Sequence, residues 1–98
     1  MTKQEHLLTC LSEEASEVIK DISKSLRFGL EDLNPSNNKV NKEAIRQEII
    51  DFLAVAEMLV NEGIIDSFTE VEDMYEKEEK KQKVLKYIDY AKRKGTII

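Results

Sequence analysis

The stretch EIIDFLAVAEMLV, residues 48–60, places Asp51 inside a nearly unbroken apolar run. A carboxylate taken out of water costs several kcal/mol unless a cation, a metal ion or several hydrogen-bond donors compensate it. The run itself holds no such partner for Asp51, so the partner must come from elsewhere in the fold. The apolar residues from Ile45 to Val60 spread around much of a helix circumference, which predicts that this helix is covered on several sides.

The composition around this run favours an all-α domain. The chain has 98 residues, of which 41% are hydrophobic and 36% charged, with three glycines and one proline. These values are typical of a helical protein with a charged surface rather than of a disordered chain or a β protein. We expect residues 1–98 to form a single helical domain with a limited core.

The charge and the termini narrow the class of protein further. A net charge of −5 disfavours a broad contact with nucleic acid or with anionic lipid. The lone Cys10 cannot form an internal disulfide, and the first ten residues lack the apolar core of a signal peptide. These features predict a cytoplasmic protein without a nucleic-acid partner. No apolar run is long enough to span a bilayer, so we expect no membrane partner either.

Periodicity and capping signals predict three helical segments. The first is expected over 3–28, the second over 42–62, and the third from near Ser67, with a loop at 29–40 between the first two. The patterns TKQE and SFTE are typical of capping boxes, and Asn41 is a candidate cap for the second helix. A glycine follows each segment: Gly29, Gly63 and Gly95.

The third segment is compatible with one helix or with two. The charged run EKEEKKQK at 76–83 separates two apolar stripes, although its Glu76–Lys80 and Glu79–Lys83 spacings suit a continuous helix. Three or four helices supply little cover for the apolar second helix. We therefore expect a helical bundle that is completed by homo-oligomerisation.

Two helices each offer a pair of carboxylates at helical spacing. Glu14 and Glu17 lie three residues apart on the first helix, in a stripe that Asp21 continues, and Glu48 and Asp51 share this spacing on the second. If these faces meet, the carboxylates repel each other unless a divalent cation binds. Oxygen ligands without His or Cys favour Mg²⁺ or Mn²⁺ over zinc, and a di-iron site would need Glu-x-x-His pairs that are absent.

The same residues resemble a known family. EEASE at 13–17 followed by EIID at 48–51 resembles the E-E-x-x-E and E-x-x-D motifs of the MazG-like, all-α nucleoside triphosphate pyrophosphohydrolases. The likeness covers most of 7–65, and SKSLRFG at 23–29 and DFLAVAEMLVNEG at 51–63 resemble its short, phage-type members. The 30 residues between the two motifs are near the upper end for the family, which a longer loop explains.

The resemblance implies a Mg²⁺-dependent enzyme that cleaves a nucleoside triphosphate between the α and β phosphates. The expected products are the monophosphate and pyrophosphate. The likeness to the phage-type members implies a preference for deoxynucleotides. Mn²⁺ is expected to substitute for Mg²⁺. Glu14, Glu17, Glu48 and Asp51 match the metal ligands of the family, and Glu13 matches a residue that orients or deprotonates the attacking water beside Glu14. Family members are dimers or tetramers, which agrees with the cover that the second helix needs.

Positive groups are expected to bind the substrate phosphates. Lys24 and Arg27 lie one to three turns beyond the acidic motif, within the stretch that the resemblance includes, which favours them. Lys77 and Lys81 lie in the third segment, where a single lysine is more often a solvated surface charge. Two alternatives remain open at this stage. One is a non-catalytic helical adaptor, which would have no need of the four carboxylates, and the other is the same site acting on a nucleoside diphosphate.

Overall fold

The first helix begins and ends where the sequence predicts. The computed structural model describes all 98 residues, and α1 spans Lys3–Phe28. The Thr2 side chain accepts a hydrogen bond from the Glu5 backbone N–H at 3.1 Å, which satisfies one of the free donors of the first turn. At the other end, the Gly29 N–H donates to the Ser25 carbonyl at 2.8 Å, and its φ of 102° turns the chain out of the helix.

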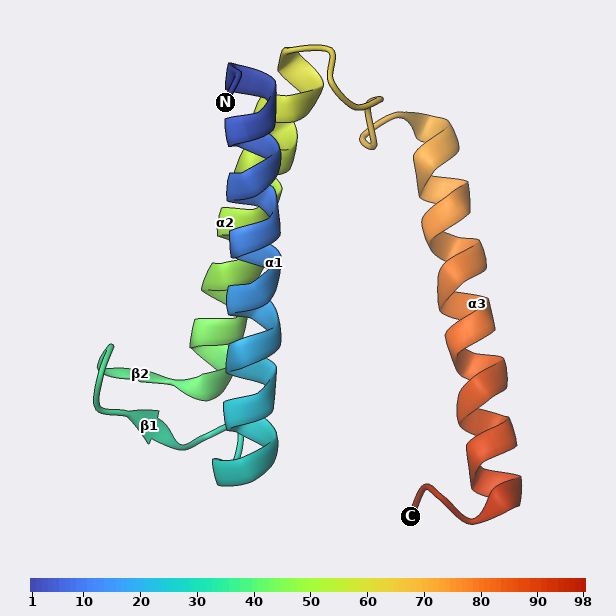
Figure 1. Ribbon diagram of the computed structural model, residues 1–98. Helices are drawn as coiled ribbons and strands as arrows, with labels where there is room; N and C mark the ends of the chain where they lie inside the picture. Colours follow the sequence, from blue (N-terminus) through green and yellow to red (C-terminus); the bar gives the residue numbers. More distant parts are fainter. The chain divides into compact units, whose positions relative to one another are not determined.

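The second helix, α2, spans Asn41–Asn61 and runs antiparallel along α1 (Figure 1). The expectation that Asn41 caps this helix is wrong, because the cap position is Val40 and has no side-chain hydrogen bond. The Asn41 side chain instead donates to the Gly29 carbonyl at 2.8 Å. This bond ties the start of α2 to the end of α1.

The segment expected to be a loop contains a small hairpin. Strands β1, Leu33–Asn34, and β2, Lys39–Val40, pair antiparallel with Leu33 opposite Val40. Asn38 between them has φ of 56°, a conformation that asparagine tolerates better than most residues. Strands of two residues are too short to show an alternating pattern, which explains why the sequence did not reveal them.

The third helix, α3, spans Val71–Lys94 without interruption. The helix begins four residues after Ser67, and the capping box expected at Ser67 and Glu70 is wrong: the box pairs Glu70 with Asp73, whose carboxylate accepts from the Glu70 N–H at 2.8 Å. The expected supports Glu76–Lys80 and Glu79–Lys83 do not form, since the chain has only two ion pairs, Lys3–Glu62 and Lys42–Glu31. The helix ends at Gly95 in the left-handed conformation.

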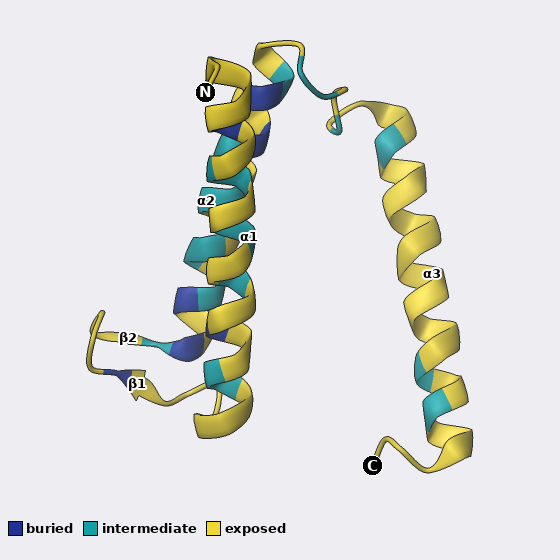
Figure 2. Cartoon of the chain, in the orientation of Figure 1, coloured by how far each residue is buried: buried dark blue, intermediate teal, exposed yellow.

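Burial differs between the two compact units of the chain, Met1–Asp66 and Ser67–Ile98 (Figure 2). In the first unit, buried residues line the contact between α1 and α2, where Leu59 is fully enclosed. Helix α3 in the second unit has no buried residue. Apolar side chains on α2 remain 39–50% exposed, namely Ile49, Ile50, Leu53 and Met58.

The all-α architecture is confirmed apart from the small hairpin, with three helices in the chain.

None of the three helices combines the length and the apolarity that crossing a bilayer requires.

Candidate metal centre

The antiparallel pairing of α1 and α2 brings acidic side chains from both helices together. Glu14 from α1 and Glu48 and Asp51 from α2 each offer a carboxylate oxygen, and these oxygens lie within 4.8 Å of one another. All three residues are half-buried. The i,i+3 spacing of Glu48 and Asp51 puts both carboxylates on the face of α2 that meets α1.

Asp51 has a neutral partner inside the chain. The Gln47 amide nitrogen, one turn earlier on α2, donates to an Asp51 carboxylate oxygen at 2.9 Å. Neither of the two ion pairs of the chain involves Asp51, Glu14 or Glu48. The negative charge of the cluster is therefore not balanced by any arginine or lysine.

Two of the expected site residues lie outside this group of three. Glu17 is exposed and does not reach the other ligand oxygens, although its charge contributes to the field at Glu48. Glu13 is also exposed, and its backbone carbonyl accepts from the Ser16 hydroxyl at 2.7 Å. Glu13 thus lies on α1 next to a ligand residue without contributing an oxygen to the cluster.

Asp21 belongs to the site and was not among the predicted residues. It is 6% exposed, which makes it the one buried acidic residue of the chain, and its carboxylate has no hydrogen bond or ion pair. Among the neighbouring charges, that of Asp21 acts most strongly on Glu48. In the sequence, Asp21 stands out only by its place on the stripe of Glu14 and Glu17. That place alone does not distinguish a buried acid from a solvated one.

The electrostatics of the cluster favour a proton or a cation. Burial raises the pKa of Glu48, and the charges of Asp21, Asp51, Glu14 and Glu17 raise it further, in that order. The donors near Glu48 are carboxylate oxygens, the ligands that Mg²⁺ and Mn²⁺ prefer, and neither His nor Cys is among them. The donor set fits a hard divalent cation.

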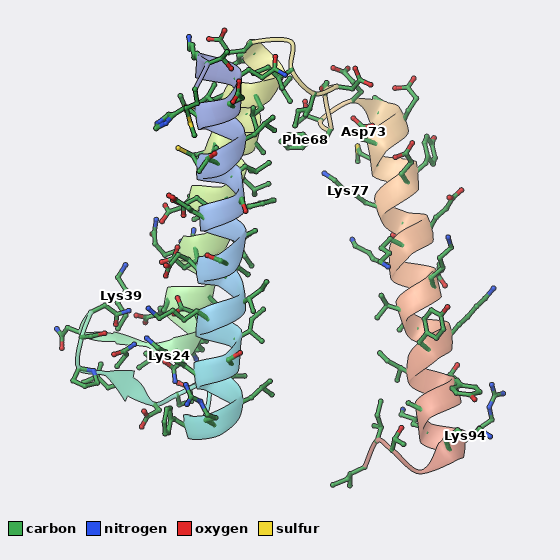
Figure 3. All side chains as sticks on the ribbon, viewed as in Figure 1. Lys24, Lys39, Phe68, Asp73, Lys77 and Lys94 are labelled. Atoms are coloured by element: carbon green, nitrogen blue, oxygen red, sulfur yellow. The ribbon has the colours of Figure 1, made fainter.

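The expected phosphate-binding residues are distributed over both units. Lys24 lies on α1 three residues after Asp21, beside the hairpin (Figure 3). It also lines a cavity. The Arg27 guanidinium lies 5.1 Å from the centroid of the Phe28 ring. Lys77 and Lys81 are exposed on α3, in the second unit. Only Lys24 and Arg27 therefore share a compact unit with the carboxylates.

Comparisons with protein-family models, with curated proteins and with solved structures find no match to the chain. What the site can bind follows from its own donors. Three half-buried carboxylates, those of Glu14, Glu48 and Asp51, lie together without an ion-pair partner, and the buried Asp21 adds its negative charge near Glu48. Such a cluster can hold a divalent metal ion together with an anionic ligand of that metal.

Proposed function

We propose that the protein is a Mg²⁺-dependent nucleoside triphosphate pyrophosphohydrolase, which converts a nucleoside triphosphate to the monophosphate and pyrophosphate. The observation that carries the proposal is the convergence of Glu14, Glu48 and Asp51 within 4.8 Å, with no arginine or lysine paired to them. These are residues of the EEASE and EIID motifs, whose likeness to the MazG-like family suggested the activity. Mn²⁺ is expected to replace Mg²⁺.

The carboxylates have separable roles in this proposal. Glu14, Glu48 and Asp51 would hold the cation, Glu17 is the expected fourth ligand from the same motif, and the charge of Asp21 acts on Glu48. When bound by these residues, a divalent cation would offset the charge of the phosphate oxygens and lower the pKa of a coordinated water. Glu13, at the exposed edge of the site, orients or deprotonates the attacking water.

Basic residues offset the repulsion between these carboxylates and a polyphosphate. Lys24 and Arg27 follow Asp21 on α1 by one to two turns and are the first candidates for phosphate contacts. Lys77 and Lys81 on α3 are the further candidates. An ammonium or guanidinium that binds the leaving pyrophosphate stabilises the charge that develops on it.

A homo-oligomer, dimer or tetramer, is part of the proposal. The support is the exposed apolar surface of α2, where Ile49, Ile50 and Leu53 remain about two-fifths exposed, and the absence of any buried residue on α3. Exposed apolar patches of this kind mark association surfaces in small proteins. Association would give α2 the cover that a single chain does not supply.

The test is product analysis on a panel of NTPs and dNTPs, with Mg²⁺ or with EDTA. We expect a monophosphate and pyrophosphate in Mg²⁺, with deoxynucleotides preferred, and no turnover in EDTA. Glu14→Gln is expected to abolish turnover, whereas Glu57→Gln, an exposed charge on α2 outside the cluster, serves as the matched control. A diphosphate with orthophosphate would contradict cleavage at the α–β linkage, and no turnover of any nucleotide would favour a non-catalytic adaptor.

A further inference from the structure

A cavity of about 250 Å³ lies in the first unit beside the end of α1. Lys24 and Phe28 line it from α1, Asn41 lines it from the start of α2, and the intervening segment supplies Asp32, Asn34 and Pro35. None of these residues belongs to the acidic cluster. The volume is smaller than that of typical drug-sized pockets and suits one part of a nucleotide rather than the whole.

Two asparagines in this cavity are buried and held in fixed orientations. Asn34 is 9% exposed, and its carbonyl oxygen Oδ1 accepts from the Ser36 backbone N–H at 3.0 Å and from the Ser36 hydroxyl at 2.7 Å. Asn41 is 3% exposed, and its Nδ2 donates to the Gly29 carbonyl at 2.8 Å. Because backbone groups are among these partners, the two ends of each amide cannot exchange without loss of a bond.

The opposite end of each amide has no hydrogen bond within the chain. Asn34 retains its Nδ2 donors, and Asn41 retains its Oδ1 acceptor. No buried side-chain nitrogen or oxygen atom of the chain lacks a partner, so these two free ends reach solvent and are open to a ligand. Both asparagines line the cavity, so one oriented amide nitrogen and one oriented amide oxygen are available there for a ligand.

The remaining lining suits a planar ring. The Phe28 side chain is 61% exposed although it is aromatic, and Arg27 covers part of its ring at 5.1 Å. Pro35 adds a further apolar wall. An exposed aromatic ring beside an apolar cavity offers a stacking surface for a heterocycle.

We propose that this cavity binds the base of the nucleotide whose phosphates are held at the acidic cluster. Each nucleobase carries an acceptor next to a donor on its edge, which complements the free Asn34 donor and the free Asn41 acceptor. Phe28 stacks on the ring. This assignment rests on the proposed function, since it extends that substrate from its phosphates to its base.

The spacing along the helices agrees with one ligand that reaches both places. Asn41 and Glu48 are seven residues apart on α2, which is about 10 Å along the helix axis. This separation is comparable with the reach of a nucleotide from its base to its phosphates. Lys24 lies between the two places, three residues after Asp21 on α1 and in the wall of the cavity.

The test is a ¹⁵N NMR titration of the full-length protein in EDTA with nucleosides, nucleoside monophosphates and inorganic phosphate. EDTA removes the metal-dependent part of binding, and nucleosides without phosphate report on the base alone. We expect nucleosides to shift the signals of Phe28, Asn41 and the Asn34 side-chain amide. Inorganic phosphate alone should leave the two asparagine amides unshifted, whereas shifts equal to those with nucleosides would overturn the assignment to a base.

Two variants give the decisive comparison. Asn34→Asp keeps the oxygen that Ser36 binds and replaces the free donor with an acceptor, so nucleoside affinity should fall about tenfold or more. Asn37→Asp is the matched control, because Asn37 makes the equivalent bond from the Lys39 N–H at 3.0 Å and does not line the cavity. Phe28→Leu should weaken binding by a similar factor while leaving the fold intact, since the ring is mostly exposed.

Wild-type affinity in both Asn34→Asp and Phe28→Leu would overturn the proposal, as would the absence of shifts with every nucleoside. The outcome is distinct from that of the enzyme assay. Turnover without nucleoside binding at this cavity would contradict the base site alone and leave the proposed hydrolase standing. Nucleoside binding without turnover would contradict the proposed hydrolase activity and support the cavity as a nucleobase site.

Discussion

Asp51 is the residue whose surroundings best separate a metal ligand from a structural ion pair. Its one hydrogen-bond partner is the Gln47 amide at 2.9 Å, and it shares the cluster with Glu14 and Glu48. Asp51→Asn keeps an oxygen that Gln47 can bind while removing a charge from crowded carboxylates. In EDTA we expect the variant to be as stable as the wild type or more stable, by about 1 kcal/mol.

The same substitution should reduce activity by orders of magnitude, through lost metal affinity. Mg²⁺ should raise the melting temperature of the wild type much more than that of Asp51→Asn, which thermal melts in EDTA and in Mg²⁺ measure. Glu57→Gln on the same helix controls for loss of a charge outside the cluster. A variant less stable than the wild type in EDTA, with unchanged turnover, would show that Asp51 is structural.

Glu48 makes stability depend on pH in the absence of metal. Burial and the neighbouring carboxylates raise its pKa in the folded protein above the usual value of about 4.3. Between these two pKa values the folded state binds more protons than the unfolded state, so the free energy of unfolding falls as pH rises. This contribution to stability is fully present below the unfolded pKa and is lost as pH rises through the folded one.

Urea unfolding in EDTA between about pH 4 and pH 7 measures the effect as the difference between wild type and Glu48→Gln. The free energy of unfolding of the wild type, measured relative to that of Glu48→Gln, should decrease as pH rises. Asp21→Asn removes the charge that acts most strongly on Glu48 and should flatten this dependence. A stability difference between the wild type and Glu48→Gln that does not change with pH would refute a raised pKa for Glu48.

The convergence of Glu14, Glu48 and Asp51 could be predicted from the sequence, because helical spacing places Glu14 beside the apolar face of α1 and puts Glu48 and Asp51 on one face of α2. The participation of Asp21 could not. Its burial arises from where α2 crosses the stripe on α1, which the sequence of one helix does not specify. Glu17, on the same stripe, turned out to be exposed for the same reason.

At the scale of elements, the start of α3 illustrates competition between two capping signals. Ser67 and Glu70 match the usual pattern, yet the structure uses Glu70 and Asp73. We expect Glu70→Ala to destabilise the first turn of α3 by about 1 kcal/mol, since the Glu70 side chain accepts from the Asp73 N–H. Ser67→Ala should have a smaller effect, because its hydroxyl makes only contacts of 3.3–3.4 Å outside the helix.

Hydrogen exchange at the amides of Val71–Met74 measures this local stability. Helix α3 has no buried residue, so tertiary packing within the chain cannot mask the loss of a cap. Faster exchange in Ser67→Ala than in Glu70→Ala would show that Ser67 caps α3, as the SFTE pattern predicts.

The lengths of α1 and α2 were predictable to within one residue because a long apolar period and flanking glycines agree. The hairpin and the cavity beside it were not. They depend on side chains that bind backbone groups, such as Asn34 with Ser36 and Asn41 with Gly29, and composition alone describes this segment only as a loop.

At the scale of the whole molecule, the apolar surface that remains on α2 predicts self-association. Light scattering at micromolar concentration should give a mass of two or four chains of 11.3 kDa each. Ile50→Glu, which places a charge on an apolar residue that is 39% exposed, should shift the population toward the monomer. A wild type that is monomeric at this concentration would refute the proposed oligomer.

Paramagnetic Mn²⁺ tests the proposal that the carboxylates of α1 and α2 form a divalent-cation site. In ¹⁵N NMR spectra, substoichiometric Mn²⁺ should first broaden the signals around Glu14, Asp21, Glu48 and Asp51, and excess Mg²⁺ should restore them. The exposed acidic residues of α3, such as Glu76 and Glu79, should be affected only at higher Mn²⁺. Equal broadening at α3 and at the cluster, or broadening that Mg²⁺ does not reverse, would show that the cluster is not a specific site for a divalent cation.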